Sequence, residues 1–181
     1  MNEYKYITKI RNGDQCALNE LIEFLYPQVY RFVYRKLQGD EVSNDIVQDT
    51  FVRFVRVIPT YQIQGKIIHY LFKIASNLCI DYWKQKGKEY DYEFEENLII
   101  DEYQNVHLDT LEKLEFERIE RCLLELSPQQ QDVILLKYFE QLTFKEIASI
   151  YQTNESTIKS RHTQALIKLR RKMKVGNPHE K

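Results

Sequence analysis

The sequence has little of what sheet proteins are built from. Only 5 Gly and 4 Pro occur among its 181 residues, whereas a sheet protein needs such residues for its many tight turns. No alternation of apolar and polar residues extends beyond about four positions, so no strand is predicted. Apolar residues instead recur at spacings of three and four along most of the chain. These patterns predict an all-α protein.

Metal-binding and catalytic motifs are missing as well. The three cysteines, Cys16, Cys79 and Cys122, are far apart and form no Cys-x-x-Cys pair, so we expect reduced thiols rather than disulfides or a zinc site. The four histidines do not cluster with carboxylates or cysteines at ligand or triad spacing, and no phosphate-binding glycine loop occurs. We therefore expect no metal, no cofactor and no enzymatic activity.

Long apolar runs are absent too. No stretch of 18 apolar residues occurs, and the opening MNEYKYITKIRNGDQ lacks the apolar segment of a secretory signal. We expect no membrane insertion and a cytoplasmic location.

The small net charge of −1 hides an uneven distribution of charges. Residues 1–88 hold 13 basic and 9 acidic side chains, a net charge of +4, and residues 113–181 hold the same numbers. Residues 89–112 hold 9 acidic side chains and no Lys or Arg. This segment has no clear helical period, so we interpret it as a flexible acidic linker. The predicted organisation is two small helical domains joined by that linker.

Apolar periodicity predicts the helices of the amino-terminal domain. One helix is expected over residues 18–37, and it contains Pro27, where we expect a kink or a break. Two more helices are expected over residues 43–58 and 67–86, with a loop between them.

The carboxyl-terminal domain carries clear helix-start signals. One helix is expected over residues 114–125. The tetrapeptides Ser127-Pro128-Gln129-Gln130 and Thr143-Phe144-Lys145-Glu146 are capping boxes, the first with the favoured proline. Only two residues separate the short helix that follows the second box from a helix capped by Asn154. So short a turn predicts a helix-turn-helix.

The helix that follows Asn154 has two different faces. The stripe predicted to be buried contains Ile158, His162, Ala165, Leu166, Leu169 and Met173. The opposite arc contains Ser156, Thr157, Lys159, Ser160, Thr163, Gln164, Arg170 and Arg171. Hydroxyl, amide and cationic groups of this kind bind base edges and phosphates. A solvated face is the plain alternative, and a membrane-surface helix would need bulky aromatic residues that this helix lacks.

The chain resembles a known protein family in both of its predicted domains. One stretch resembles the carboxyl-terminal DNA-binding domain of bacterial extracytoplasmic-function (ECF) sigma factors. It runs from Leu126 to Lys172 and reads LSPQQQDVILLKYFEQLTFKEIASIYQTNESTIKSRHTQALIKLRRK. The other domain of that family is matched in order and spacing by NGDQCALNELIEFLYPQVYRFVYRKLQGD, SNDIVQDTFVRFVR and YLFKIASNLCIDYWKQK. The resemblance implies a subunit that binds core RNA polymerase, directs it to promoter DNA and assists melting. Because many relatives are held by an anti-sigma factor, such a partner is implied as well.

The resemblance also assigns residues to roles. For reading the minus-thirty-five element, it implies Ser156, Thr157, Lys159, Ser160, Arg161, Thr163 and Gln164. For contact with phosphate or polymerase, it implies Arg170, Arg171 and Lys172. For the minus-ten element, it implies Tyr61, Lys66, Lys73, Asn77 and Lys84. For core polymerase, it implies Asp45, Gln48, Asp49 and Arg53, which helical spacing places on one face. We expect Tyr61 in an exposed loop, and we expect Phe72 and Trp83, two aromatic residues of the same stretch that are outside this set, in the core.

The chain departs from the family pattern at three places. Gln152 occupies a turn position where the family often has Gly, which is tolerable if Gln152 adopts another turn geometry. Tyr70 stands where Trp is usual, and the loop YQIQGKI differs from the common Phe-Arg-Gly pattern. A stand-alone helix-turn-helix regulator, which binds its operator without polymerase, is the alternative function. A helical adaptor comes third, because it does not explain the cationic face.

Overall fold

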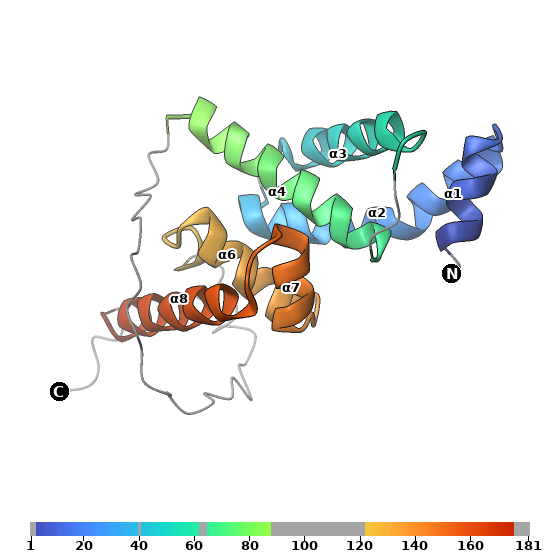
Figure 1. Cartoon of the computed structure of the whole chain (residues 1–181). Helices are drawn as coiled ribbons and strands as arrows, with labels where there is room; N and C mark the ends of the chain where they lie inside the picture. Colours follow the sequence, from blue (N-terminus) through green and yellow to red (C-terminus); the bar gives the residue numbers. More distant parts are fainter. Residues whose placement is uncertain (1–2, 40, 62–64, 88–121, 176–181) are drawn as a thin grey trace. The chain divides into compact units, whose positions relative to one another are not determined.

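The computed structural model describes residues 3–39, 41–61, 65–87 and 122–175. All regular structure within these residues is helical (Figure 1), which confirms the all-α prediction. The chain divides into two compact units, residues 1–88 and 89–181. The segment interpreted as an acidic linker and most of the helix expected over residues 114–125 lie outside the described residues. None of the described helices has the length and apolar character needed to cross a bilayer.

The amino-terminal unit is built around three mutually packed helices. They are α2 (Gln15–Leu37), α3 (Ser43–Val57) and α4 (Ile67–Gln85), and a shorter helix, α1 (Glu3–Arg11), packs against α2 (Figure 1). The bounds of α2, α3 and α4 agree closely with the predicted helices, whereas the sequence patterns do not predict α1. The fully buried side chains that the three larger helices share include Leu21, Val29, Phe32, Val47, Phe54, Leu71 and Phe72.

Pro27 does not interrupt α2. The helix runs continuously from Gln15 to Leu37 through the proline, so the break that we considered is wrong. Proline removes one backbone donor and crowds the preceding turn. Leu25 and Val29, on either side of Pro27, are almost fully buried in the core. The free energy gained by burying this face of α2 therefore outweighs the tendency of Pro27 to break the helix.

The carboxyl-terminal unit contains the predicted helix-turn-helix. Its described elements are α6 (Pro128–Ile134), the π-helical segment η1 (Leu135–Phe139), α7 (Phe144–Tyr151) and α8 (Glu155–Val175), and α8 packs on α6 and α7. Both capping boxes are present, with reciprocal bonds between the first and fourth residues of each tetrapeptide. The amide of Ile158 donates to the carbonyl of Asn154 over 3.3 Å, which places Asn154 at the start of α8.

The turn between α7 and α8 is closed by a residue in the left-handed conformation. Gln152 has φ 52° and ψ 47°, the left-handed conformation that a glycine adopts at the end of a helix. The amide of Thr153 donates to the carbonyl of Ala148 over 3.0 Å and closes the turn. Gln152 therefore takes the glycine-like turn geometry and not another one. Glutamine accepts the glycine-like geometry at a cost of about 1 kcal/mol.

Candidate nucleic-acid and polymerase interfaces

The buried side of α8 fixes the direction in which its polar side faces. Ile158 and Ala165 have no solvent exposure, and Leu169 is 7 % exposed. The other residues of the predicted stripe are partly exposed; they are His162, Leu166 and Met173. The helix is thus anchored along its apolar stripe. Its polar arc is left to face outward, as predicted.

Most of the polar arc is accessible. Ser156 and Lys159 are exposed, and Thr157, Ser160, Thr163 and Gln164 are partly exposed. Lys159 pairs with Glu155 one turn earlier, at 2.9 Å between exposed side chains. Such a pair contributes about 0.3–0.5 kcal/mol, so the ammonium can exchange this carboxylate for a DNA phosphate at little cost.

Arg161 is also a minus-thirty-five candidate, and it is partly buried. Burial lowers the pKa of its guanidinium, and the charges of Tyr151 and Asp132 act in the opposite direction. Asp132, on α6, is only 1 % exposed. A buried carboxylate needs a cation or hydrogen-bond donors. Arg161 thus lies near the charge of Asp132 and is less accessible than Ser156 and Lys159.

The basic end of α8 is exposed. Arg170, Arg171 and Lys172 all face solvent, and Lys172 forms an ion pair with Glu125 between half-exposed side chains. Arg170 and Arg171 therefore have the clearer access to an outside anion.

The four charged or amide residues predicted for core polymerase share the exposed face of α3. Asp45, Gln48, Asp49 and Arg53 are all exposed, whereas Ile46, Val47, Phe51 and Phe54 on the other side are buried. The helix presents two carboxylates and a guanidinium within three turns. This face is formed by the helical spacing alone and needs no partner to assemble it.

The predicted minus-ten residues divide into two groups. Lys73, Asn77 and Lys84 lie on α4 at spacings of four and seven residues, which places them along one stripe. Lys66 precedes the first turn of α4 and is exposed, as are Asn77 and Lys84. Helical spacing therefore places two cations and an amide along one side of α4, with the exposed Lys66 just before the helix.

Tyr61 falls outside that stripe, and the expectation that it lies in an exposed loop is wrong. Its side chain is only 8 % exposed, and its ring lies 5.7 Å from the ring of Phe54 and 5.0 Å from that of Tyr70. Burial, with smaller effects of Glu3 and Tyr70, raises the pKa of Tyr61 to about 12. Tyr61 is a neutral core residue. Phe72 is buried as expected, whereas Trp83 is only partly buried.

Comparison with known proteins identifies the two units. Residues 21–89 match the family model described as sigma-70 region 2, and residues 116–169 match the model described as sigma-70, region 4. The chain belongs to the ECF sigma factors. Because region 2 and region 4 occur in one chain, the alternative function as a stand-alone regulator is disfavoured.

Relatives of this sigma factor span nearly its whole length. It is 28 % identical to the ECF RNA polymerase sigma factor SigW of Bacillus subtilis, over 94 % of this chain and 96 % of SigW. It is 23 % identical to the RNA polymerase sigma factor YlaC of Bacillus subtilis, over 91 % of this chain and 96 % of YlaC.

Two solved structures share the fold of this sigma factor. The sigma factor RpoE in its complex with the anti-sigma factor NepR, from Bartonella quintana, gives a TM-score of 0.62 at 23 % identity, over 88 % of this chain and 98 % of RpoE. CnrH in its complex with the cytosolic domain of CnrY gives a TM-score of 0.68 at 18 % identity, over 95 % of this chain and 97 % of CnrH.

An aromatic cluster packs around His162 of α8. The ring of His162 stacks on Tyr138 at 5.7 Å and meets the edge of Phe144 at 5.0 Å, and its Nε2 lies 2.9 Å from the Tyr138 hydroxyl. The Nζ of Lys137 lies 4.8 Å from the centre of the Phe144 ring. Burial, and then the nearby charge of Lys137, lowers the pKa of His162 below its ordinary value of 6.5. His162 is therefore neutral at pH 7.

We expect the carboxyl-terminal unit to lose stability as the pH falls below about 6.5, because unfolded His162 takes up a proton before folded His162 does. The loss should continue down to the lowered pKa of the folded state and then level off. Thermal unfolding between pH 7.5 and pH 5 measures it. The variant His162→Gln should flatten the dependence, while His69→Gln, in the other unit, should not. An equal slope in wild type and His162→Gln would contradict this explanation.

Proposed function

We propose that this sigma factor binds core RNA polymerase through the exposed face of α3 and reads promoter DNA with α8 and the polar stripe of α4. The observation that carries the proposal is that region 2 and region 4 occur in order in one chain. Each has a well-packed core and an outward polar helix face. The proposed role requires no enzymatic chemistry of the chain itself, and it places the protein with polymerase and DNA in the cytoplasm.

The recognition helix α8 would read the minus-thirty-five element from the major groove. In a helix-turn-helix, the first turns of the second helix meet the base edges. Ser156, Thr157, Lys159 and Ser160 occupy those turns, with Thr163 and Gln164 following. A good base contact provides about 1–3 kcal/mol of discrimination.

The stripe on α4 would hold the melted minus-ten strand. Cations that follow a groove attract the phosphates of single-stranded DNA, and Lys66, Lys73 and Lys84 supply three of them. The amide of Asn77 lies among these cations and offers both a donor and an acceptor to an unpaired base. Extruding a base costs a few kcal/mol, so contacts made only with the extruded base favour opening.

We expect Asn77→Ala to lower promoter opening more than it lowers formation of the closed complex. Loss of one base contact corresponds to about a tenfold change or more in the opening equilibrium. A fluorescent base in the minus-ten region reports opening, and a filter-binding titration of the closed complex provides the comparison. Because Asn77 is exposed, the variant should keep its stability. Equal losses in both steps would contradict a role in reading the melted strand.

We expect Arg170→Ala combined with Arg171→Ala to weaken holoenzyme binding to all promoter sequences alike. If both guanidinium groups hold phosphates, the slope of log affinity against log salt should fall by about 2. Binding titrations at several salt concentrations measure the slope. The double variant Lys145→Ala and Glu146→Gln, at the start of α7, removes one positive and one negative charge. It should leave the slope unchanged. A change in base preference without a change in slope would assign these residues to base reading instead.

We also propose an anti-sigma partner for this chain. RpoE, a protein of the same fold, forms a complex with the anti-sigma factor NepR. A protein that competes with polymerase for the α3 face would hold the chain inactive. Competition between such a partner and core polymerase for the wild-type chain tests this point.

Footprinting tests the function against the regulator alternative. Promoter DNA should be protected at both elements when core polymerase and the chain are present together, and the minus-ten region should stay unprotected with the chain alone. A stand-alone regulator would protect its operator without polymerase. Full protection by the chain alone would therefore contradict the proposal.

A further inference from the structure

The short helix α1 contacts both ends of the connection between α3 and α4. It spans Glu3–Arg11 and thus lies before residues 21–89, which match region 2. The connection itself joins the helix proposed to bind polymerase to the helix proposed to bind melted DNA. Contacts at its two ends therefore add to the α3–α4 packing in setting how these two surfaces are placed relative to each other.

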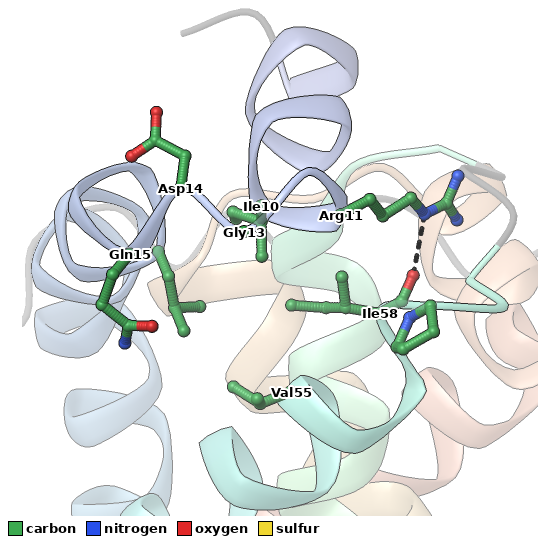
Figure 2. Close-up of a pocket in the computed structure, with 9 residues that line it drawn as sticks. Ile10, Arg11, Gly13, Asp14, Gln15, Val55 and Ile58 are labelled. Carbon is green, nitrogen blue, oxygen red and sulfur yellow. Dashed lines mark hydrogen bonds between the residues drawn. The ribbon is translucent and has the colours of Figure 1, made fainter.

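At one end of the connection, Arg11 binds the backbone where α3 stops. Its Nε donates to the carbonyl oxygen of Ile58 over 3.0 Å, and one terminal nitrogen donates to the carbonyl oxygen of Tyr61. Figure 2 shows Arg11 reaching from the end of α1 toward Ile58. One planar guanidinium therefore bridges two carbonyls on either side of Pro59 and Thr60, which is the forked geometry that arginine supplies and lysine does not.

At the other end, Glu3 caps the amino terminus of α4, although it lies far from α4 in the sequence. Its Oε2 accepts a hydrogen bond from the amide of Ile67, the first residue of α4, over 2.9 Å. The residue at the cap position, Lys66, makes no side-chain capping bond to the helix. A carboxylate at a helix amino terminus is favoured by the exposed amides and by the helix dipole. Glu3 thus supplies the cap that the local sequence does not.

α1 is held in place by contacts separate from these two. Ile7, in its middle, is 1 % exposed, and the hydroxyl of Tyr6 donates to Glu20 on α2 over 2.9 Å. The apolar contact anchors the helix, so the two charged side chains at its ends are free to act on the connection. Tyr61, whose carbonyl Arg11 binds, is itself packed between Phe54 of α3 and Tyr70 of α4.

We propose that α1 is a positioning clasp, in which Arg11 and Glu3 hold the two ends of the α3–α4 connection and so set the placement of the DNA-facing stripe of α4. This inference rests on the proposed function. The clasp orders the start of α4 before DNA arrives, and preorganised groups avoid the entropy cost of ordering during binding. Arg11 and Glu3 are positioning residues that need not touch DNA.

The test compares full-length variants in the holoenzyme. Arg11→Ala and Glu3→Ala each remove one end of the clasp. Glu3→Gln keeps an acceptor for the Ile67 amide, and Arg11→Lys keeps a cation without the fork. Lys9→Ala, an exposed change on the same helix, is the matched control. Each variant is assayed for core affinity, for opening with a fluorescent base at minus ten, and for transcription from a promoter library randomised at both elements.

We expect Arg11→Ala and Glu3→Ala to lower opening about tenfold and to broaden base preference at the minus-ten element. Core affinity and minus-thirty-five preference should stay within about twofold of wild type. Glu3→Gln should restore most of the opening, because its amide oxygen still accepts the bond, whereas Arg11→Lys should remain defective. Hydrogen exchange in the free protein should show faster exchange at the start of α4 in both alanine variants.

Two results would overturn the inference. One is normal opening and base preference in both alanine variants. The other is a loss of opening matched by equal losses in core affinity and minus-thirty-five preference, which would reduce α1 to general stabilisation. If one alanine variant fails to fold, the variant at the opposite end and Glu3→Gln still decide between these outcomes. Failure of the wild-type chain to open any library promoter with core polymerase would instead refute the proposed function, and the inference with it.

Discussion

Replacing Asp49 with lysine together with Gln48→Ala should weaken binding of core RNA polymerase by about 100-fold. Both side chains are exposed on the same face of α3, so the change leaves the core of the unit intact. Reversing a charge converts an attraction across the interface into a repulsion, and disrupting such a pair costs about 2–5 kcal/mol. Titration of fluorescently labelled core enzyme with the full-length chain measures the affinity.

Two controls accompany this experiment. Glu23→Lys makes the same charge change at an exposed position on α2, outside the four residues proposed for the interface, and should leave core affinity near wild type. Binding of a minus-thirty-five fragment should be unaffected by Asp49→Lys with Gln48→Ala, because α8 belongs to the other unit. Unchanged core affinity in the double variant would remove the α3 face from the proposed interface.

Ile158→Ala should remove most of the folding stability of the carboxyl-terminal unit. Ile158 has no solvent exposure, and truncating a buried isoleucine to alanine costs about 2–5 kcal/mol because it leaves a cavity. A small domain has only about 3–5 kcal/mol of stability from its core. The variant should lose minus-thirty-five binding while retaining most of its affinity for core polymerase through the amino-terminal unit.

The same helix provides the matched control for that loss. Ile167 is 55 % exposed, so Ile167→Ala should change stability by no more than about 0.5 kcal/mol. Hydrogen exchange and thermal unfolding, followed for the carboxyl-terminal unit, separate the two variants. Equal stabilities would mean that the buried stripe of α8 does not hold the recognition helix in place.

The features that could be predicted from the sequence are those specified by nearby residues. The two capping boxes depend on side chains three residues apart, and both form as predicted. The buried stripe of α8 and the exposed face of α3 follow from helical spacing alone. These local signals were sufficient to predict the helix-turn-helix and most of the candidate surfaces.

The features that were missed depend on partners distant in the sequence. Tyr61 looks like a loop residue, but it is buried because Phe54 and Tyr70 from two helices close around it. The partial burial of Arg161 near the charge of Asp132 on α6 likewise has no signal in the neighbouring sequence. Gln152 takes a left-handed conformation because the closing turn requires it, against its own preference.

The clasp formed by α1 illustrates the same limit. Glu3 bonds to an amide 64 residues away, and Arg11 bonds to carbonyls 47 and 50 residues away. No periodicity or motif near either residue signals these contacts. Only the packing of α1 against the rest of the unit brings the charged side chains to the connection.

Run-off transcription with purified core RNA polymerase tests the central claim most directly. The template is a linear promoter selected from a library randomised at both elements, and the reactions contain core enzyme alone, core enzyme with the wild-type chain, or core enzyme with the Asp49→Lys, Gln48→Ala variant. A transcript of one defined length should appear only with the wild-type chain. A specific transcript from core enzyme alone, or no transcript from any library member with the wild-type chain, would contradict the account.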